Sequence, residues 1–136
     1  MNEWEERNQK VVDEFRANGG EVKGWAPLIL LTNTGAKTGR TRITPLMYVS
    51  DGDRVLAVAS KGGSPKHPEW YLNLLAHPEV TVEVGNEKYD ATARVLSGAE
   101  REKAFTRAAE VFHPYAEYQK KTAREIPVIA LERNNK

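Results

Sequence analysis

Hydrophobic and polar positions over the first 20 residues follow the period of a helix. Trp4, Val11, Val12 and Phe15 fall at i, i+7, i+8 and i+11, which places them on one face, and the glycines of "ANGG" end the predicted helix. This face could dock on a membrane, but residues 1–25 hold six acidic residues against four basic ones, whereas membrane-surface helices are rich in lysine and arginine. We therefore expect the helix to pack on the domain or on a partner subunit.

From residue 27 onward the pattern becomes that of strands. The apolar run "PLILLTNT" is typical of a buried strand, and "ITPLMYVSDGDRVLAVAS" predicts two strands around an Asp51-Gly52 turn. "VTVEVGNEKYDATARVL" repeats this arrangement around Gly85-Asn86, and "IPVIALE" predicts a last strand. These runs predict two hairpins in a mostly antiparallel sheet.

Helices are predicted between and after the hairpins. Pro68 suits the first position of a short helix that ends before His77-Pro78. The stretch "SGAE", residues 97–100, fits a capping box that opens a helix running to about Phe112, where His113-Pro114 breaks it. The order of elements predicts an α+β domain with flanking helices, in which the sheet curls into a partly closed barrel that protects its edges.

Length and composition narrow the class of protein. At 136 residues the chain has the size of one domain, and we divide it into a helical segment, 1–24, and a main domain, 25–136. The absence of cysteine excludes disulfides and thiolate chemistry, and a net charge of +1 argues against a nucleic-acid partner. No apolar run approaches the roughly 20 residues of a membrane span, and the acidic start is unlike a signal peptide, so we expect a cytoplasmic protein without stable membrane insertion.

Candidate chemistry gathers in two loops. "TNTGAKTGRTR" carries Lys37, Arg40 and Arg42 within six residues, and Ser60-Lys61-Gly62-Gly63 joins adjacent glycines to a lysine. Such glycines let successive backbone N–H groups face one anion, although a solvated hairpin loop would explain the first stretch equally well. No P-loop spacing and no G-x-S-x-G elbow is present, and each histidine precedes a proline, which favours turn roles. Anion-holding loops without a self-sufficient catalytic group indicate a borrowed cofactor.

Three ordered blocks carry a family resemblance. "LLTNTGAKTGRTRITPL", "VASKGGSPKHPEWYLNLLAHPEV" and "HPYAEYQKKTAREIPVIAL" together resemble the deazaflavin-dependent nitroreductase family, which uses coenzyme F420, over about residues 25–133. The resemblance implies a split β-barrel that holds the deazaflavin in a groove. It also implies that basic residues bind the phosphate and oligoglutamate tail of the cofactor.

Position by position, the resemblance implies a set of site residues. Lys37 and Arg42 would meet the phosphate and tail, with Arg40 a weaker candidate for the tail. The groove and the chromophore would be contacted by Pro45, Leu46, Ala59, Ser60, Lys61, Gly62, Gly63, Trp70 and Asn73. Trp70 and the neighbouring Tyr71 could instead be core residues, as aromatic residues at a helix start usually are. Lys66 and His67 gain no role and are expected to be surface residues of the turn.

The same resemblance implies the reaction. Reduced F420 would deliver a hydride to a quinone or nitro acceptor, while Tyr115 and Tyr118, with Ser60, would act at the substrate. The two tyrosines share one side if their segment is helical, but they could equally pack that helix. Phe112 and Met47 replace aromatic positions of relatives that act on bulky nitro compounds, which leaves the identity of the substrate open. Quinones are the expected acceptors, with other activated acceptors tolerated.

Several alternatives stay open at this point. One is an FMN-dependent split-barrel oxidoreductase, which would not need a tail-binding loop because FMN has no polyanionic tail. Another is a non-catalytic protein that stores F420, which would bind the cofactor without turnover. Two arrangements are left open: a homodimer formed through a sheet face, and a first helix that caps the groove.

Overall fold

The computed structural model describes residues 3–52 and 54–134, with residues 3–5 described by their backbone alone. The elements of this part of the chain, in order, are α1 (Glu3–Ala17), β1 (Leu28–Thr34), β2 (Thr41–Met47), β3 (Val49–Asp51), β4 (Arg54–Val58), the 3-10 turn η1 (Lys61–Gly63), α2 (Glu69–Ala76), β5 (Glu79–Val84), β6 (Glu87–Val95), α3 (Gly98–Val111), α4 (Pro114–Lys120) and β7 (Val128–Arg133). None of the described helices is long and apolar enough to cross a bilayer.

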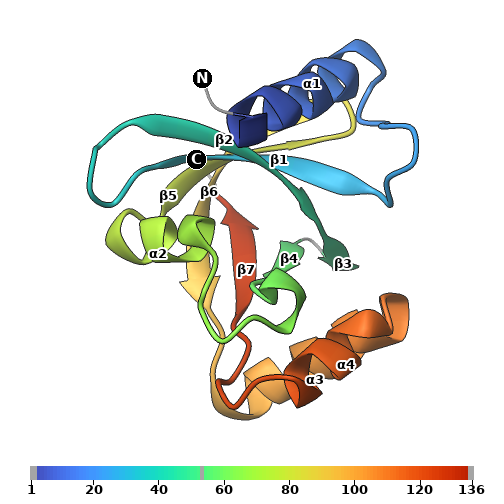
Figure 1. Cartoon of the computed structure of the whole chain (residues 1–136), viewed down its shortest axis with the longest axis vertical. Coiled ribbons are helices and arrows are strands. Elements are labelled where there is room, and N and C mark those ends of the chain that lie inside the picture. The colour runs from blue at the N-terminus through green and yellow to red at the C-terminus, as the bar shows by residue number, and fades with distance from the viewer. Residues whose placement is uncertain (1–2, 53, 135–136) are drawn as a thin grey trace.

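The seven strands form one antiparallel sheet in the order β2-β1-β5-β6-β7-β4-β3. β2 and β3 lie at opposite edges of this order, yet Tyr48 alone separates them in the chain. One residue can join the two edges only if the sheet curls until the edges approach each other, as Figure 1 shows. The predicted α+β fold with a curled antiparallel sheet is therefore confirmed.

β1 is buried on both faces, which explains its unbroken apolar run. Leu28 and Leu30 pack with α1, whereas Ile29 and Leu31 point into the interior of the half-barrel. Val11, Val12 and Phe15 supply the α1 side of the first contact. The predicted contribution of the Trp4 side chain lies outside the described residues. Figure 1 shows α1 lying across β1 and β2, at the opposite end of the molecule from α3 and α4.

A partly buried ion pair also ties α1 to the sheet. Arg16 donates to both carboxylate oxygens of Glu83 on β5, over 3.1 and 2.8 Å, and only 11% of the Glu83 side chain is exposed. We expect Arg16→Ala to lower the free energy of unfolding by about 1–3 kcal/mol, because the buried carboxylate loses its partner. Urea denaturation measures this change. The double variant with Glu83→Gln should recover part of the loss, and a single variant as stable as the wild type would contradict the prediction.

The predicted strand over 43–50 differs from the observed structure. The Asp51-Gly52 turn does join a hairpin, but only the short β3 pairs with β4. The longer part, β2, starts at Thr41 and pairs instead with β1, from Leu28↔Met47 to Thr34↔Thr41. Closing the half-barrel requires this bend at Tyr48, and an alternating pattern cannot reveal it. The second hairpin, β5 with β6 around Gly85-Asn86, is confirmed.

Two helix starts also differ from prediction. Ser97 precedes α3, but its side chain forms no capping hydrogen bond. Glu100 binds Arg94, over 3.0 and 3.1 Å, instead of completing a capping box. Pro68 occupies the extended position before α2 rather than its first helical position. The predicted end of α3 near Phe112 is confirmed, and after His113 the chain starts a second helix, α4, with Pro114 at its beginning.

Candidate functional site

The basic loop between β1 and β2 is closed by its own backbone. Gly35 donates to Arg40 O over 2.8 Å, and Gly39 donates to Gly35 O over 2.9 Å. Gly39 needs its positive φ of 70°, whereas Gly35 is required for space, since a Cβ there would lie 2.7 Å from Thr38 Oγ1. Lys37, Arg40 and Arg42 are all exposed, and none forms a salt bridge with a carboxylate of the described residues. The loop therefore offers three cations to an external anion.

Two asparagines attach this loop to α2. Asn73 Oδ1 accepts a hydrogen bond from Ala36 N–H over 2.9 Å, and Asn33 Nδ2 donates to Trp70 O over 3.2 Å. Both asparagine side chains are buried, and the two bonds are part-buried. Asn73 thus holds the basic loop in place with its carbonyl oxygen. Asn33, which is not singled out in the sequence, is its counterpart on β1.

β2 carries the site from the basic loop toward the interior of the half-barrel. Arg42, Thr44 and Leu46 share one strand face, because they lie opposite Asn33, Leu31 and Ile29. Leu46 packs on the barrel core. With a rise of about 3.3 Å per residue, Arg42 and Leu46 are separated by about 13 Å. One strand face therefore connects a cation with an apolar wall.

The predicted neighbours Pro45 and Leu46 do not share this face. Pro45 is buried and lies opposite Leu30, which belongs to the cluster under α1. Leu46 packs on the other side, together with Tyr48 and Trp70, against the barrel core. Of the two, Leu46 has the side chain directed to the half-barrel interior. Tyr48, at the bend between β2 and β3, joins it there without having been identified from the sequence.

The second predicted loop forms a tight turn in left-handed backbone. Lys61, Gly62 and Gly63 have φ values of 46°, 63° and 85°, and Lys61 is the only described non-glycine residue with positive φ. Backbone strain of this kind is concentrated at binding and catalytic sites. Gly63 and Ser64 N–H groups are used within the turn, bonded to Ser60 O and Lys61 O. The Lys61 and Gly62 N–H groups have no acceptor among the described residues. Of the backbone N–H groups predicted to bind an anion here, these two are therefore the ones left free to do so.

The turn rests on α4, which brings the predicted tyrosines close. A Cβ on Gly63 would lie 2.9 Å from Tyr118 O and 3.1 Å from Lys121 Cβ. Tyr118 is half-buried, whereas Tyr115 is 5% exposed within the core beneath α3 and α4. Burial raises the pKa of Tyr115 to about 12, with the neighbouring Tyr118 adding to the shift. This environment favours the packing role for Tyr115 and leaves Tyr118 as the accessible tyrosine.

Ala59 and Ser60 lie at the start of the turn and are both buried. Their carbonyl oxygens accept hydrogen bonds from Arg124, over 3.2 and 2.9 Å. The Ser60 hydroxyl makes no hydrogen bond with a described residue. Arg124 is not identified in the sequence analysis, because a lone arginine in "TAREIP" carries no local pattern. Its contacts reach across more than 60 residues of chain.

His67 is not the plain surface residue that the sequence predicts. Its Nδ1 lies 3.2 Å from Arg124 Nη1, and its ring packs on Tyr71 with 4.8 Å between centroids. Burial lowers the pKa of His67, and the positive charge of Arg124 lowers it further. The neutral ring can accept the hydrogen bond from Arg124. Lys66 is exposed, as expected.

This pKa shift predicts a loss of stability on mild acidification. The unfolded chain protonates His67 near pH 6.5, whereas the folded chain does so only at lower pH, so stability is complete above that value and falls as the pH decreases below it. We expect Tm to fall between about pH 7.5 and about pH 5.5, and to fall less in His67→Gln, whose amide oxygen accepts without titrating. His113→Gln is the control, because His113 is exposed. Equal slopes in the wild type and His67→Gln would contradict the prediction.

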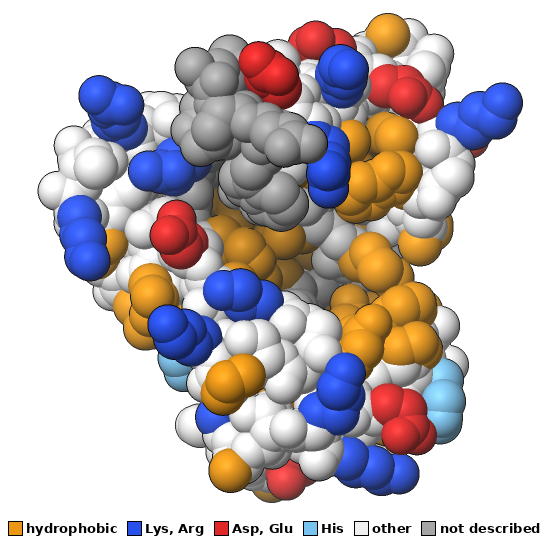
Figure 2. Space-filling model, viewed as in Figure 1, with side chains coloured by type: hydrophobic (Ala, Val, Ile, Leu, Met, Phe, Trp, Pro, Cys, Tyr) orange, Lys and Arg blue, Asp and Glu red, His pale blue; other side chains and the backbone are white. Residues whose placement is uncertain are grey.

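A hollow with an apolar floor lies near these elements. Figure 2 shows the viewed face hollowed near its centre, with hydrophobic side chains in the floor and along one rim. Figure 1, from the same side, places this hollow over β4 and β7, between the β2–β3 edge and the end formed by α3 and α4. The apolar floor could receive an aromatic ring system.

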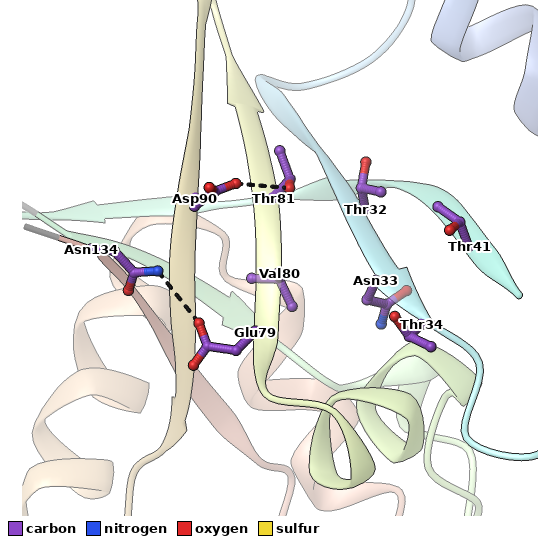
Figure 3. A pocket seen from close by; sticks show the side chains of 9 residues that line it. All are labelled: Thr32, Asn33, Thr34, Thr41, Glu79, Val80, Thr81, Asp90 and Asn134. Atoms are coloured by element: carbon purple, nitrogen blue, oxygen red, sulfur yellow. Dashed lines mark hydrogen bonds between the residues drawn. The ribbon is translucent and has the colours of Figure 1, made fainter. Parts of the chain in front are cut away.

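A separate pocket of about 320 Å³ lies on the sheet and contains none of the predicted site residues. Figure 3 shows Asp90 directed to Thr81 and Glu79 directed to Asn134, with threonines of β1 and β2 opposite. Its charged lining residues, Glu79 and Asp90, are acidic. Two carboxylates would repel a phosphate, so this pocket does not suit an anionic cofactor.

The sequence matches the F420H(2)-dependent quinone reductase family over residues 5–133. An F420H(2)-dependent quinone reductase of Mycobacterium tuberculosis is 40% identical over 120 residues, which cover 85% of this chain and 79% of the relative. A solved F420-H2 dependent reductase, FDR-A, is 51% identical with a TM-score of 0.73, covering 78% of this chain and 94% of that one. A structure described as a domain-swapped dimer is 45% identical with a TM-score of 0.75, covering 95% and 97%.

A more distant likeness concerns the fold alone. The heme storage protein HutZ of Vibrio cholerae is 14% identical, with a TM-score of 0.60 over 95% of this chain and 92% of that one. The predicted split barrel is confirmed by such neighbours together with the observed half-barrel. The family match covers nearly all described elements and supports the deazaflavin-dependent enzyme over a storage protein. This chain belongs to the F420H(2)-dependent quinone reductase family.

Proposed function

We propose that this chain binds F420H2 along the inner face of β2 and reduces quinones in the hollow between the β2–β3 edge and α4. One observation carries the proposal. β2 joins the cations of the basic loop to an apolar inner face, and the strained turn at Lys61–Gly63 rests on α4. A ligand with an anionic tail and a planar aromatic ring matches this order of surfaces.

The anionic parts of the cofactor fit the unpaired positive groups. Lys37 and Arg42, with Arg40 further along the loop, would bind the phosphate and the oligoglutamate tail through charge-assisted hydrogen bonds. The N–H groups of Lys61 and Gly62 would bind a phosphate oxygen at the turn. Asn73 would act by holding the basic loop, since Ala36 occupies its carbonyl oxygen.

The ring would lie against apolar side chains. Leu46, Tyr48 and Trp70 are partly buried on the barrel core and leave part of their surface available for contact. When bound, reduced F420 supplies the hydride. The task of these side chains is to exclude water and to fix the ring against the acceptor.

The acceptor needs a hydrogen-bond donor, because a quinone gains negative charge when a hydride arrives. Tyr118 is the candidate donor from α4, since it is half-buried and its backbone contacts Gly63 of the turn. The Ser60 hydroxyl is a second candidate. Tyr115 is left out of this role, because it is buried in the core. Nitro compounds and other activated acceptors would use the same donors.

A titration tests the proposal directly. Purified protein should quench the fluorescence of F420 with saturable binding and should oxidise F420H2 when menadione is added. FMN, titrated in parallel, should bind more weakly because it has no oligoglutamate tail. Weak F420 binding beside tight FMN binding would overturn the proposal in favour of an FMN enzyme. Tight F420 binding without turnover over a panel of quinones would overturn the catalytic part.

The expected homodimer stays a prediction. It is supported by a 45% identical relative whose structure is described as a domain-swapped dimer. In this chain α1 is connected to β1 by residues 18–27, which include three glycines with positive φ, and such a linker suits exchange of a terminal helix. Light scattering during size-exclusion chromatography decides between one and two copies.

A further inference from the structure

Arg124 joins the end of the chain to the predicted anion-binding turn. It lies between α4 and β7, and its guanidinium donates to Ala59 O over 3.2 Å, to Ser60 O over 2.9 Å and to Ser64 O over 2.9 Å. Nη1 also lies 3.2 Å from His67 Nδ1. No salt bridge links Arg124 to a carboxylate among the side chains described, those of residues 6–52 and 54–134. All described partners of the guanidinium are therefore neutral acceptors of a single segment, 59–67.

The loop that carries Arg124 is itself fixed. Gln119 Nε2 donates to Arg124 O over 2.8 Å, and Gln119 Oε1 accepts from Ile126 N–H over 2.9 Å. Arg101, which is 4% exposed, donates to that same Oε1 over 2.9 Å and to Ile126 O. The position of Arg124 is thus set by a part-buried bond to Gln119 of α4, and Arg101 of α3 in turn fixes Gln119 and Ile126.

The bonds of Arg124 span the part of the turn that is under strain. Ser60 and Ser64 flank Lys61, Gly62 and Gly63, whose left-handed backbone is unfavourable for Lys61. By binding carbonyls on both sides, Arg124 prevents the two ends from separating and relaxing. It also turns the carbonyl oxygens of Ser60 and Ser64 toward itself. The Lys61 and Gly62 N–H groups stay without a described acceptor on the exposed part of the turn.

We propose that Arg124 is a positioning residue for cofactor binding: it holds the Ser60–Ser64 turn in the conformation that presents the Lys61 and Gly62 N–H groups to a phosphate. This inference rests on the proposed function and adds to it a residue that does not touch the cofactor. Lysine cannot replace arginine in this role, because one ammonium cannot reach three carbonyls arranged around a planar fork.

The test compares two ligands in two variants. F420 carries the phosphate and tail, whereas its deazaflavin chromophore with the ribityl chain alone carries neither. We expect Arg124→Lys to weaken F420 binding by about tenfold and to weaken binding of the phosphate-free chromophore by less than about twofold, because the turn acts on the phosphate. Arg107→Lys is the matched control, since Arg107 donates to Ser50 O over 2.8 Å, away from the turn. Fluorescence titration gives each Kd, and circular dichroism verifies folding.

Each outcome decides the matter. Wild-type protein that fails to bind F420 refutes the proposed function, whereas the role of Arg124 fails if the wild type binds and Arg124→Lys binds equally well. Equal losses for both ligands would assign Arg124 a general effect on the fold and overturn the proposal. Arg124→Gln serves as a second variant if the lysine variant is unfolded. Two unfolded variants would make Arg124 a folding residue and would also overturn it.

Discussion

Replacing Lys37 and Arg42 together with alanine should weaken F420 binding by about a hundredfold or more, since each charge-assisted contact contributes about 1.5–3 kcal/mol. Both side chains are exposed, so the fold should be unaffected. The loss should be greatest at low salt, because added ions screen exposed charges. FMN binding should change much less, since FMN has a phosphate but no oligoglutamate tail. Fluorescence titrations with F420 and with FMN, each at two salt concentrations, give four Kd values for each protein.

Lys88→Ala with Arg107→Ala is a suitable control for the double variant. It removes the same number and types of charge from exposed positions on β6 and α3. If this control weakened F420 as much as the first pair, the effect would come from net charge rather than from a specific loop. Equal losses of F420 and FMN in the first pair would favour an FMN enzyme.

Gly63→Ala should disrupt the turn and cofactor binding together. Its φ of 85° is unfavourable for alanine, and the added Cβ would lie 2.9 Å from Tyr118 O, where backbone cannot give way cheaply. We expect a loss of about 2–4 kcal/mol in the free energy of unfolding, from strain and from overpacking together. Turnover of F420H2 with menadione should fall by at least about tenfold, because the turn and α4 separate.

Gly24→Ala separates the two causes. Gly24 has the same φ of 85°, but nothing lies within 4 Å of a Cβ built there. The Gly24→Ala variant should therefore lose only the part of the free energy of unfolding that comes from backbone strain, about 1 kcal/mol, with turnover unchanged. Equal destabilisation of the two variants in urea would mean that the contact with α4 contributes nothing, contrary to the prediction.

Local patterns were sufficient to locate most strands but insufficient to arrange them. Alternation and turn residues predict β5 and β6 around Gly85-Asn86, because pairing there is between neighbours in the chain. β2 also pairs with a chain neighbour, β1, but the alternating pattern does not show that the run over 43–50 divides at Tyr48, where the half-barrel closes. The failed capping box at Ser97 has a related cause: Glu100 is drawn to Arg94 on β6 and to Arg54 on β4, which only the folded chain brings near.

The candidate site shows the same division. The cations of the basic loop and the double glycine are visible in sequence, because anion binding requires those residue types close together. The sequence does not reveal Arg124, Asn33 or His67. Their contacts are long-range bonds to backbone groups or to side chains far away in the chain, which leave no local pattern. The family resemblance supplied Tyr115 and Tyr118 as a pair, and burial distinguishes them. Tyr115 lies in the core, whereas Tyr118 is half-buried at its edge.

The contact between the turn and α4 has a consequence for how such enzymes can diversify. The atoms nearest to a Cβ built on Gly63 are the carbonyl oxygen and Cα of Tyr118 and the Cβ of Lys121. Nearly every residue type possesses these atoms. Side chains of α4 other than Gln119, which holds the loop of Arg124, can therefore change without disturbing the turn. Under the proposed function, in which Tyr118 contacts the acceptor and the turn contacts the cofactor, mutations in this helix would alter the range of acceptors and leave the affinity for the reduced cofactor unchanged. New substrate ranges could then evolve from one cofactor site by small steps.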